Sequence, residues 1–107
     1  MTDFKDRERA EEAKFAHDED MHFRITARRN RLLGAWAADL MKLSAVEAEA
    51  YAKAVVQADF EEAGDDDIVR KLLGDLTSAG VDIDEARIRA AIEDKMIDAK
   101  RQLLEAK

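Results

Sequence analysis

Two histidines and a run of three aspartates are the residues of this chain that could hold a metal ion. His17 and His22 are five residues apart, whereas helical zinc ligands are usually three or four apart, and no third ligand accompanies them. Asp65, Asp66 and Asp67 lack the alternating ligands, inner glycine and closing glutamate of a calcium loop. We therefore predict no bound metal. Solvated histidines or a pH-sensing pair, and acids at a helix N-terminus, remain the alternatives.

The only basic cluster consists of Arg28, Arg29 and Arg31. These arginines are the candidate contacts for an anion or a nucleotide, although no glycine-rich phosphate loop accompanies them. The alternative is a basic helix face that pairs with acids of this fold or of a partner. No cysteine is present, and the few hydroxyl residues have no recognisable activating group. We therefore expect no catalytic residues and a protein that is not an enzyme.

Charge separates the beginning of the chain from the rest. From Asp3 to Arg31, 16 of 29 residues are Asp, Glu, Lys or Arg, and they fall on every face of a helix drawn through them. Such a helix gains little by packing on its own domain and is marginally stable alone. Two readings stay open: an idle, frayed extension, or a peptide that docks on another protein.

Phe4 and Phe15 favour the docking reading. They are eleven residues apart, which is about 1100° of helical rotation and within about 20° of three full turns. Both rings therefore fall on one face of a helix. Two aromatic anchors on a charged, helix-prone segment fit a peptide that folds into a partner's groove.

The net charge of −7 comes entirely from residues 32–107, which hold 17 acids and 10 bases, because residues 1–31 hold eight of each. This balance argues against nucleic acid and anionic lipid as partners. No apolar run approaches the roughly 20 residues of a membrane span, and the start of the chain has no signal-peptide pattern. We expect a cytoplasmic protein without direct membrane insertion.

Apolar residues repeat at helical spacing in four segments. The first helix is expected over 18–42, with a continuation back to Phe4 left open. A capping box of Ser44 and Glu47 begins the second, over 45–62. The third covers 65–78, and the fourth runs toward the C-terminus behind a cap at Asp82. Since no strand pattern competes, the fold class is all-α: a small antiparallel four-helix bundle, 18–107, behind a mobile or marginally helical segment, 1–17.

Several blocks of the sequence resemble one known family. They are FKDRERA at 4–10, KFAHD at 14–18 and ARRNRLLGAWAA at 27–38, followed by Tyr51-Ala52, DFEE at 59–62 with Gly64-Asp65, and Lys71. These blocks are similar to the zeta subunits of α-proteobacterial F-type ATP synthases, which are natural inhibitors of ATP hydrolysis. The similarity covers nearly the whole chain.

This resemblance implies a four-helix bundle with an inhibitory N-terminal region. In the family, that region inserts between catalytic subunits of the soluble head, made of α, β and γ subunits, and stops rotation in the hydrolysis direction. The protein would then be peripheral to the inner membrane through the ATP synthase. The family is also associated with adenine-nucleotide binding to the bundle, and no other cofactor is implied.

On this reading, nine residues of the first segment contact the partner. They are Phe4, Asp6, Arg7, Glu8, Arg9, Glu11, Glu12, Lys14 and Phe15. The rings would pack into the partner, and the charged side chains would pair with charges of its groove. The rival reading is a non-enzymatic interaction module, or a helical module that binds an adenine nucleotide through the arginine cluster.

Overall fold

The structure is a computed structural model that describes residues 3–58 and 64–105, with side chains from residue 20 onward. These residues form four helices and no strand: α1 (Asp3–Leu40), α2 (Ala45–Ala58), α3 (Asp66–Ser78) and α4 (Glu85–Glu105). The all-α class and the four helices predicted from the sequence are confirmed. Helix α1 is continuous from Asp3, which settles the open question of its start.

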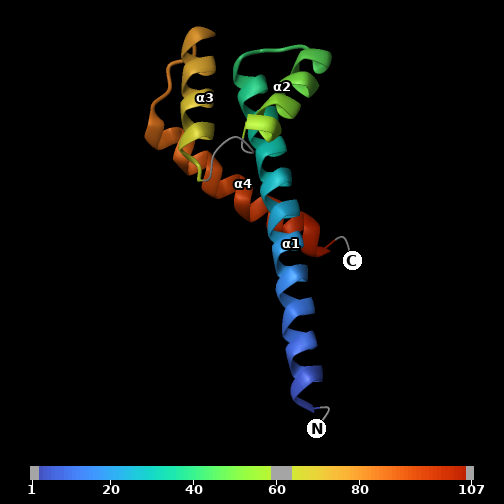
Figure 1. Ribbon diagram of the computed structural model, residues 1–107. Coiled ribbons are helices and arrows are strands. Elements are labelled where there is room, and N and C mark those ends of the chain that lie inside the picture. Colours follow the sequence, from blue (N-terminus) through green and yellow to red (C-terminus); the bar gives the residue numbers. More distant parts are fainter. Residues whose placement is uncertain (1–2, 59–63, 106–107) are drawn as a thin grey trace.

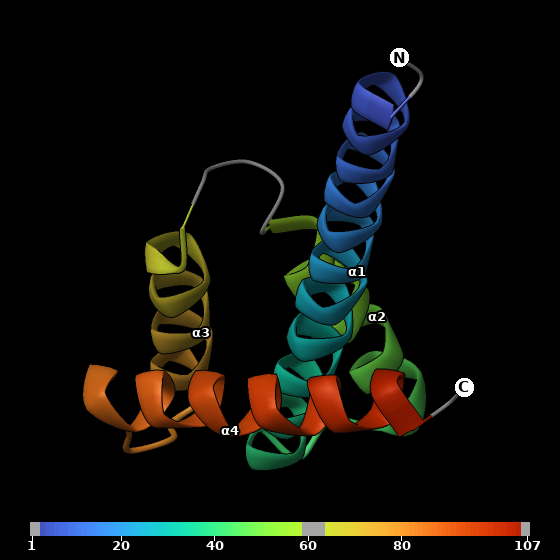
Figure 2. The ribbon, with the colours of Figure 1, turned by 90° about the horizontal axis from the view of Figure 1, so that it is seen from below.

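Helix α1 sets the shape of the molecule. It has 38 residues, and the molecule measures 66 × 26 × 21 Å. In Figure 1 the C-terminal half of α1 lies against the other helices, and its N-terminal half extends beyond them. Helix α2 folds back beside α1, whereas α4 crosses α1 obliquely in both views (Figures 1 and 2). The arrangement is thus less regular than an antiparallel bundle.

The core lies where the C-terminal half of α1 meets the other three helices. Its largest fully buried apolar side chains are Leu33, Val55, Ile68, Val69, Leu72, Leu76 and Ile88. Each such side chain contributes roughly 1.5–3 kcal/mol when removed from water. Trp36, Tyr51 and Met41 pack on this cluster while remaining partly exposed. Within α3, Ile68, Val69, Leu72 and Leu76 recur at the spacing of one helix face.

Helices α1 and α2 approach each other most closely at Gly34. A Cβ atom added there would lie 2.6 Å from the Cα atom of Ala52, which is closer than real Cβ atoms come. The crossing therefore requires a residue without a side chain on α1. Ala52 itself is buried, so the small residue on α2 completes the contact.

Two helices end in the same left-handed C-terminal motif. After α1, Leu43 N–H donates to Ala38 C=O at 3.0 Å and Lys42 adopts φ 59°. After α3, Val81 N–H donates to Leu76 C=O at 2.9 Å and Gly80 adopts φ 84°. These are Schellman motifs. Since Lys42 belongs to the first of them, the predicted end of α1 at this residue was two residues late.

The start of α2 confirms the predicted capping box. Glu47 N–H donates to Ser44 Oγ at 3.2 Å, and Ser44 N–H donates to Glu47 Oε1 at 3.0 Å. The pKa of Glu47 lies below its usual value, because the backbone N–H of Ser44, followed by its hydroxyl, favours the ionised carboxylate. The predicted continuation of α2 from 59 to 62 lies outside the described residues.

The predicted cap of α4 at Asp82 was wrong. The cap is Asp84, whose Oδ1 accepts a hydrogen bond of 2.8 Å from Arg87 N–H. Residues 81–84 are not helical, and Val81 and Ile83 both pack on the core. In a helix, side chains two residues apart point to nearly opposite faces, so Val81 and Ile83 could not both face the core. The packing of this pair therefore delays the helix until Glu85.

Candidate functional site

The predicted docking residues from Phe4 to Phe15 all lie in the first part of α1. Their backbone is helical and continuous with the part of α1 that enters the core. Their side chains lie outside the described residues, so their contacts with a partner stay a prediction. The division of the chain at residue 17 also stays a prediction, and α1 runs through that point without a break.

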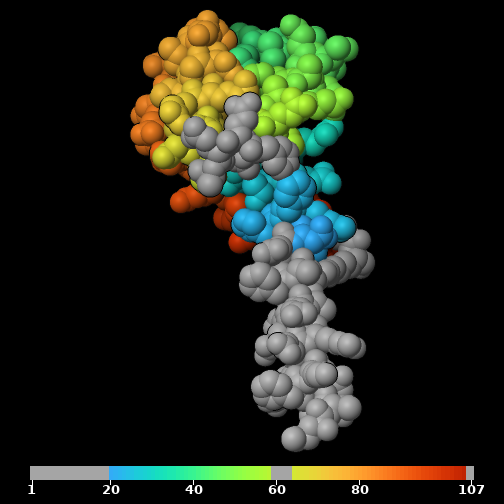
Figure 3. Space-filling view, in the orientation of Figure 1, coloured from blue at the N-terminus to red at the C-terminus, as the bar shows by residue number. Residues whose placement is uncertain are grey.

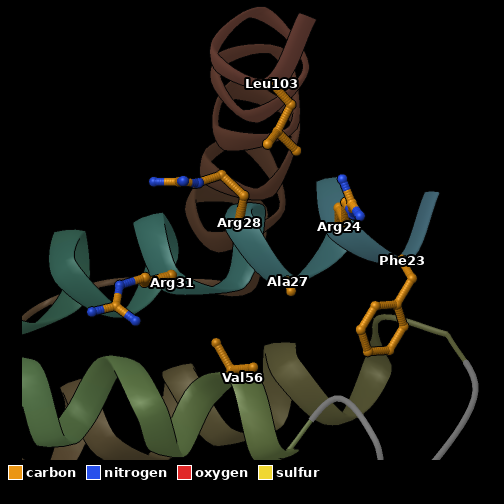
Figure 4. Close-up of a pocket in the computed structure, with 7 residues that line it drawn as sticks. All are labelled: Phe23, Arg24, Ala27, Arg28, Arg31, Val56 and Leu103. Carbon is orange, nitrogen blue, oxygen red and sulfur yellow. The ribbon is translucent and has the colours of Figure 1, made fainter. Parts of the chain in front are cut away.

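A groove lies on the adjacent part of α1, where this helix meets the body of the molecule. The body consists of the C-terminal half of α1 with α2, α3 and α4. The groove has a volume of about 580 Å³ and is lined by Phe23, Arg24, Ala27, Arg28, Arg31, Val56 and Leu103. Figure 4 shows five of these residues on α1, with Val56 reaching up from α2 on one side and Leu103 approaching from α4 on the other. The groove therefore combines an apolar lining with three guanidinium groups.

The three arginines of the groove differ in their partners. Arg24 forms an ion pair with Asp20, one turn earlier on α1, with 3.2 Å between Nε and Oδ2. Arg31 pairs with Glu49 of α2. Arg28 is exposed and has no ion pair or hydrogen bond to any side chain that the structure describes. Arg28 is thus the guanidinium most available to an external carboxylate or phosphate.

Arg29 does not join Arg28 and Arg31 in this groove. Its side chain is buried, and its Nη2 lies 3.0 Å from Oδ1 of Asp65, directly before α3. Its Nε and Nη2 also donate to Oδ1 of the buried Asn30. Arg29 therefore ties the middle of α1 to the start of α3. Only two of the three predicted anion contacts share a surface.

The sequence contained a signal both for the absence of Arg29 from the groove and for the presence of Arg24 in it. Arg29 is four residues after Ile25 and four before Leu33, so it lies on the apolar face of α1, and both neighbours are buried. Arg24 is four residues before Arg28 and seven before Arg31, which places it with them on the polar face. Spacing along the helix, rather than proximity in the sequence, identifies the groove arginines.

The three consecutive aspartates pair with arginines of three different segments. Asp65 pairs with Arg29 of α1, Asp67 with Arg70 of α3 at 2.5 Å, and Asp66 with Arg89 of α4 at 3.1 Å. The pKa of Arg89 is raised because its guanidinium donates hydrogen bonds to Asp66 and also to Glu85.

Among the residues that the structure describes, no three His, Cys, Asp or Glu side chains lie close enough together to hold a metal ion. His22 is exposed on α1, and the side chain of His17 is outside this region.

A second polar cluster joins α2 to α3. Tyr51 Oη donates to Asp75 Oδ2 at 2.7 Å, and Lys71 Nζ lies 3.1 Å from the same oxygen. Lys71 Nζ is also 5.3 Å from the centre of the Tyr51 ring. Burial, followed by the hydrogen bond to Asp75 and its charge, raises the pKa of Tyr51 far above its usual value. This cluster keeps Tyr51 neutral and serves as a connection between helices.

Comparison with known proteins gives a family match and a similar solved structure. No curated protein matches it. A chain with a solution NMR structure is 48% identical, with a TM-score of 0.72 over 81% of this chain and 99% of its own. In the described part of the chain, no helix is long and apolar enough to cross a membrane. The family model of ATPase inhibitor subunit zeta matches residues 1–102, and the chain therefore belongs to that family.

Proposed function

We propose that this protein inhibits ATP hydrolysis by an F-type ATP synthase by inserting the N-terminal part of α1 between catalytic subunits. One structural observation carries the proposal. Helix α1 is a single helix from Asp3 to Leu40, and its first half extends beyond the body (Figure 1). Membership of the inhibitor family supports the direction of the effect. The protein would act as a regulator without catalysis of its own.

The shape suits insertion to a limited depth. A single helix is about 10–12 Å wide with its side chains. The N-terminal part of α1 can therefore enter an opening that is too narrow for the body. The body then stops further entry and leaves residues 1–17 inside the head. Contacts between the partner and the predicted docking residues would hold residues 1–17 inside the head. With the helix inserted among the α, β and γ subunits, rotation in the hydrolysis direction would be blocked.

Phe4 and Phe15 are expected to supply much of the binding free energy. Each buried Phe ring is worth roughly 1.5–3 kcal/mol, whereas ordering a disordered segment on binding costs about 2–5 kcal/mol. A segment that is already helical in the free chain loses less of this free energy, because less has to be ordered. Docking would also place the protein at the inner membrane through the enzyme.

Adenine-nucleotide binding is the alternative, and the arginine groove is its natural site. That groove lies in the middle of α1, where backbone N–H groups are bonded within the helix. Nucleotide phosphates are usually held by free N–H groups at helix N-termini or in glycine-rich loops. The groove offers side chains alone, so we favour inhibition as the principal function.

A deletion tests the proposal. Removal of residues 1–15 should abolish inhibition of the cognate ATPase, while the fluorescence of Trp36, the only tryptophan, should remain that of the folded body. Joint replacement of Phe4 and Phe15 by Ala should weaken inhibition about a hundredfold or more, from two buried rings. Val46→Ala is the matched apolar control, since Val46 is 81% exposed in the first turn of α2, far along the chain from the docking residues. Full inhibition by the deleted chain would refute the proposal.

A further inference from the structure

We propose that the groove of Arg24, Arg28 and Arg31 is a second docking surface, which binds an acidic, partly apolar segment of the ATPase head. This inference rests on the proposed function, because it names the surface that meets the enzyme outside the inserted helix. The occupant would place one carboxylate against Arg28 and an apolar side chain between Phe23 and Leu103. The groove would thereby hold the body at the opening that α1 enters.

The composition of the groove is that of a protein interface. Aromatic and arginine side chains are enriched at such interfaces, where apolar contact lies beside charged contact. Here Phe23 is 53% exposed, and Val56 and Leu103 are partly exposed beside three arginines. In Figure 4 these side chains come from three helices, so the surface is formed only in the folded body.

Charge complementarity identifies the occupant as acidic. Residues 20–31 hold three exposed arginines and one aspartate, whereas the rest of the described chain is acidic overall. Asp20 and Glu49 already pair with Arg24 and Arg31, which leaves Arg28 for an external group. A partner carboxylate would therefore meet an exposed basic cluster here, in a chain whose net charge is −7. Such patterns select orientation and partner more than they raise affinity.

The position of the groove matches the proposed insertion. Phe23 is six residues after residue 17 on the same helix, a rise of about 9 Å at 1.5 Å per residue. Any subunit surface around the opening would therefore lie close to the groove once residues 1–17 have entered. In Figure 3 the first coloured residues of α1, in blue, lie at one end of the coloured part of the molecule.

A charge reversal tests the groove with the full-length protein and the cognate ATPase head. Arg28→Glu should raise the concentration for half-maximal inhibition about tenfold, and the difference should shrink as salt is added. Arg70→Glu is the matched control, because Arg70 is 70% exposed on α3 and does not line the groove. It should change inhibition less than twofold. Thermal unfolding followed by Trp36 fluorescence should be similar for both variants.

A cross-link tests the acidic character of the occupant. Arg28→Lys keeps the charge and introduces an amine, which a zero-length carbodiimide can join to a carboxylate in contact with it. We expect an amide bond to an Asp or Glu of the ATPase head, located by mass spectrometry of the digested complex. Arg70→Lys should give no such product. An inhibited complex without a cross-link from position 28 would overturn the proposal.

The outcomes separate this inference from the proposed function. Normal inhibition by Arg28→Glu, together with loss of inhibition on deleting residues 1–15, overturns the groove and retains insertion. Weak inhibition by Arg28→Glu with a fully active deletion refutes insertion. Binding to the head should also be measured with and without ATP. If the Arg28→Glu defect appears only with ATP, the groove binds the nucleotide and the acidic-segment proposal is wrong.

Discussion

At the scale of single residues, Gly34 carries the closest helix contact. Gly34→Ala should lower the free energy of unfolding by about 1–3 kcal/mol, because the new methyl group would lie 2.6 Å from the backbone of Ala52, which cannot rotate away. Urea unfolding followed by Trp36 fluorescence measures this. The control is Gly74→Ala, where the added Cβ meets nothing within 4 Å. That change should raise stability by about 0.5–1 kcal/mol, and equal effects of both changes would contradict the argument.

Tyr51 provides a pH-dependent prediction. Its pKa is raised in the folded state, so its contribution to stability is fully present below its unfolded pKa, about 10, and is lost as the pH rises toward the folded value. Because it is the only tyrosine, tyrosinate absorbance reports it alone. We expect no tyrosinate near pH 10 while circular dichroism shows a folded protein. Tyr51→Phe should lower stability at neutral pH by about 1 kcal/mol and remove this alkaline loss.

Arg29 shows what the sequence could and could not predict about the candidate site. Its spacing from Ile25 and Leu33 indicated the apolar face of α1, but its bonds to Asn30 and Asp65, which allow its burial, could not be predicted. A buried arginine is rare enough that the polar reading is normally correct. The partner that permits burial, Asp65, is 36 residues away in the sequence. Only the tertiary structure brings the two together.

At the scale of helices, the caps decide where each element begins. Asp84→Ala should lower stability by about 1 kcal/mol, because it removes the acceptor for Arg87 N–H at the start of α4. Asp82→Ala should change stability little, since Asp82 lies in the non-helical segment before the cap. Thermal unfolding of both variants checks this. A larger loss of stability for Asp82→Ala than for Asp84→Ala would show that Asp82 is the cap, as predicted from the sequence.

The helices themselves could be predicted because local signals suffice for them. The apolar spacing in α3 and the Ser44–Glu47 box require only residues that are neighbours along a helix. The start of α4 could not be chosen this way, since Asp82 and Asp84 are both good caps. Packing of Val81 and Ile83 on the core makes that choice. The oblique crossing of α4 similarly depends on contacts between helices.

At the scale of the whole molecule, α1 combines two proposed roles in one continuous helix. Its C-terminal half contributes Leu33 and Ala37 to the core, and its N-terminal half is the proposed inserting segment. A continuous helix fixes the distance and the rotation between the two at 1.5 Å and 100° per residue. The arginine groove lies between them. The body can then set the depth of insertion only if the helix remains unbroken.

Breaking α1 outside the body tests this coupling. Glu19→Pro should remove a backbone hydrogen bond and kink the helix, at a local cost of about 3 kcal/mol. Inhibition should weaken at least about tenfold, because the inserted segment would no longer be held at a fixed depth and rotation. Glu19→Ala, which favours the helix, is the control and should inhibit normally. Unfolding of the body, followed by Trp36 fluorescence, should be alike in both. Equal inhibition by the two variants would mean that the N-terminal segment acts as a tethered peptide, with no mechanical role for the continuity of α1.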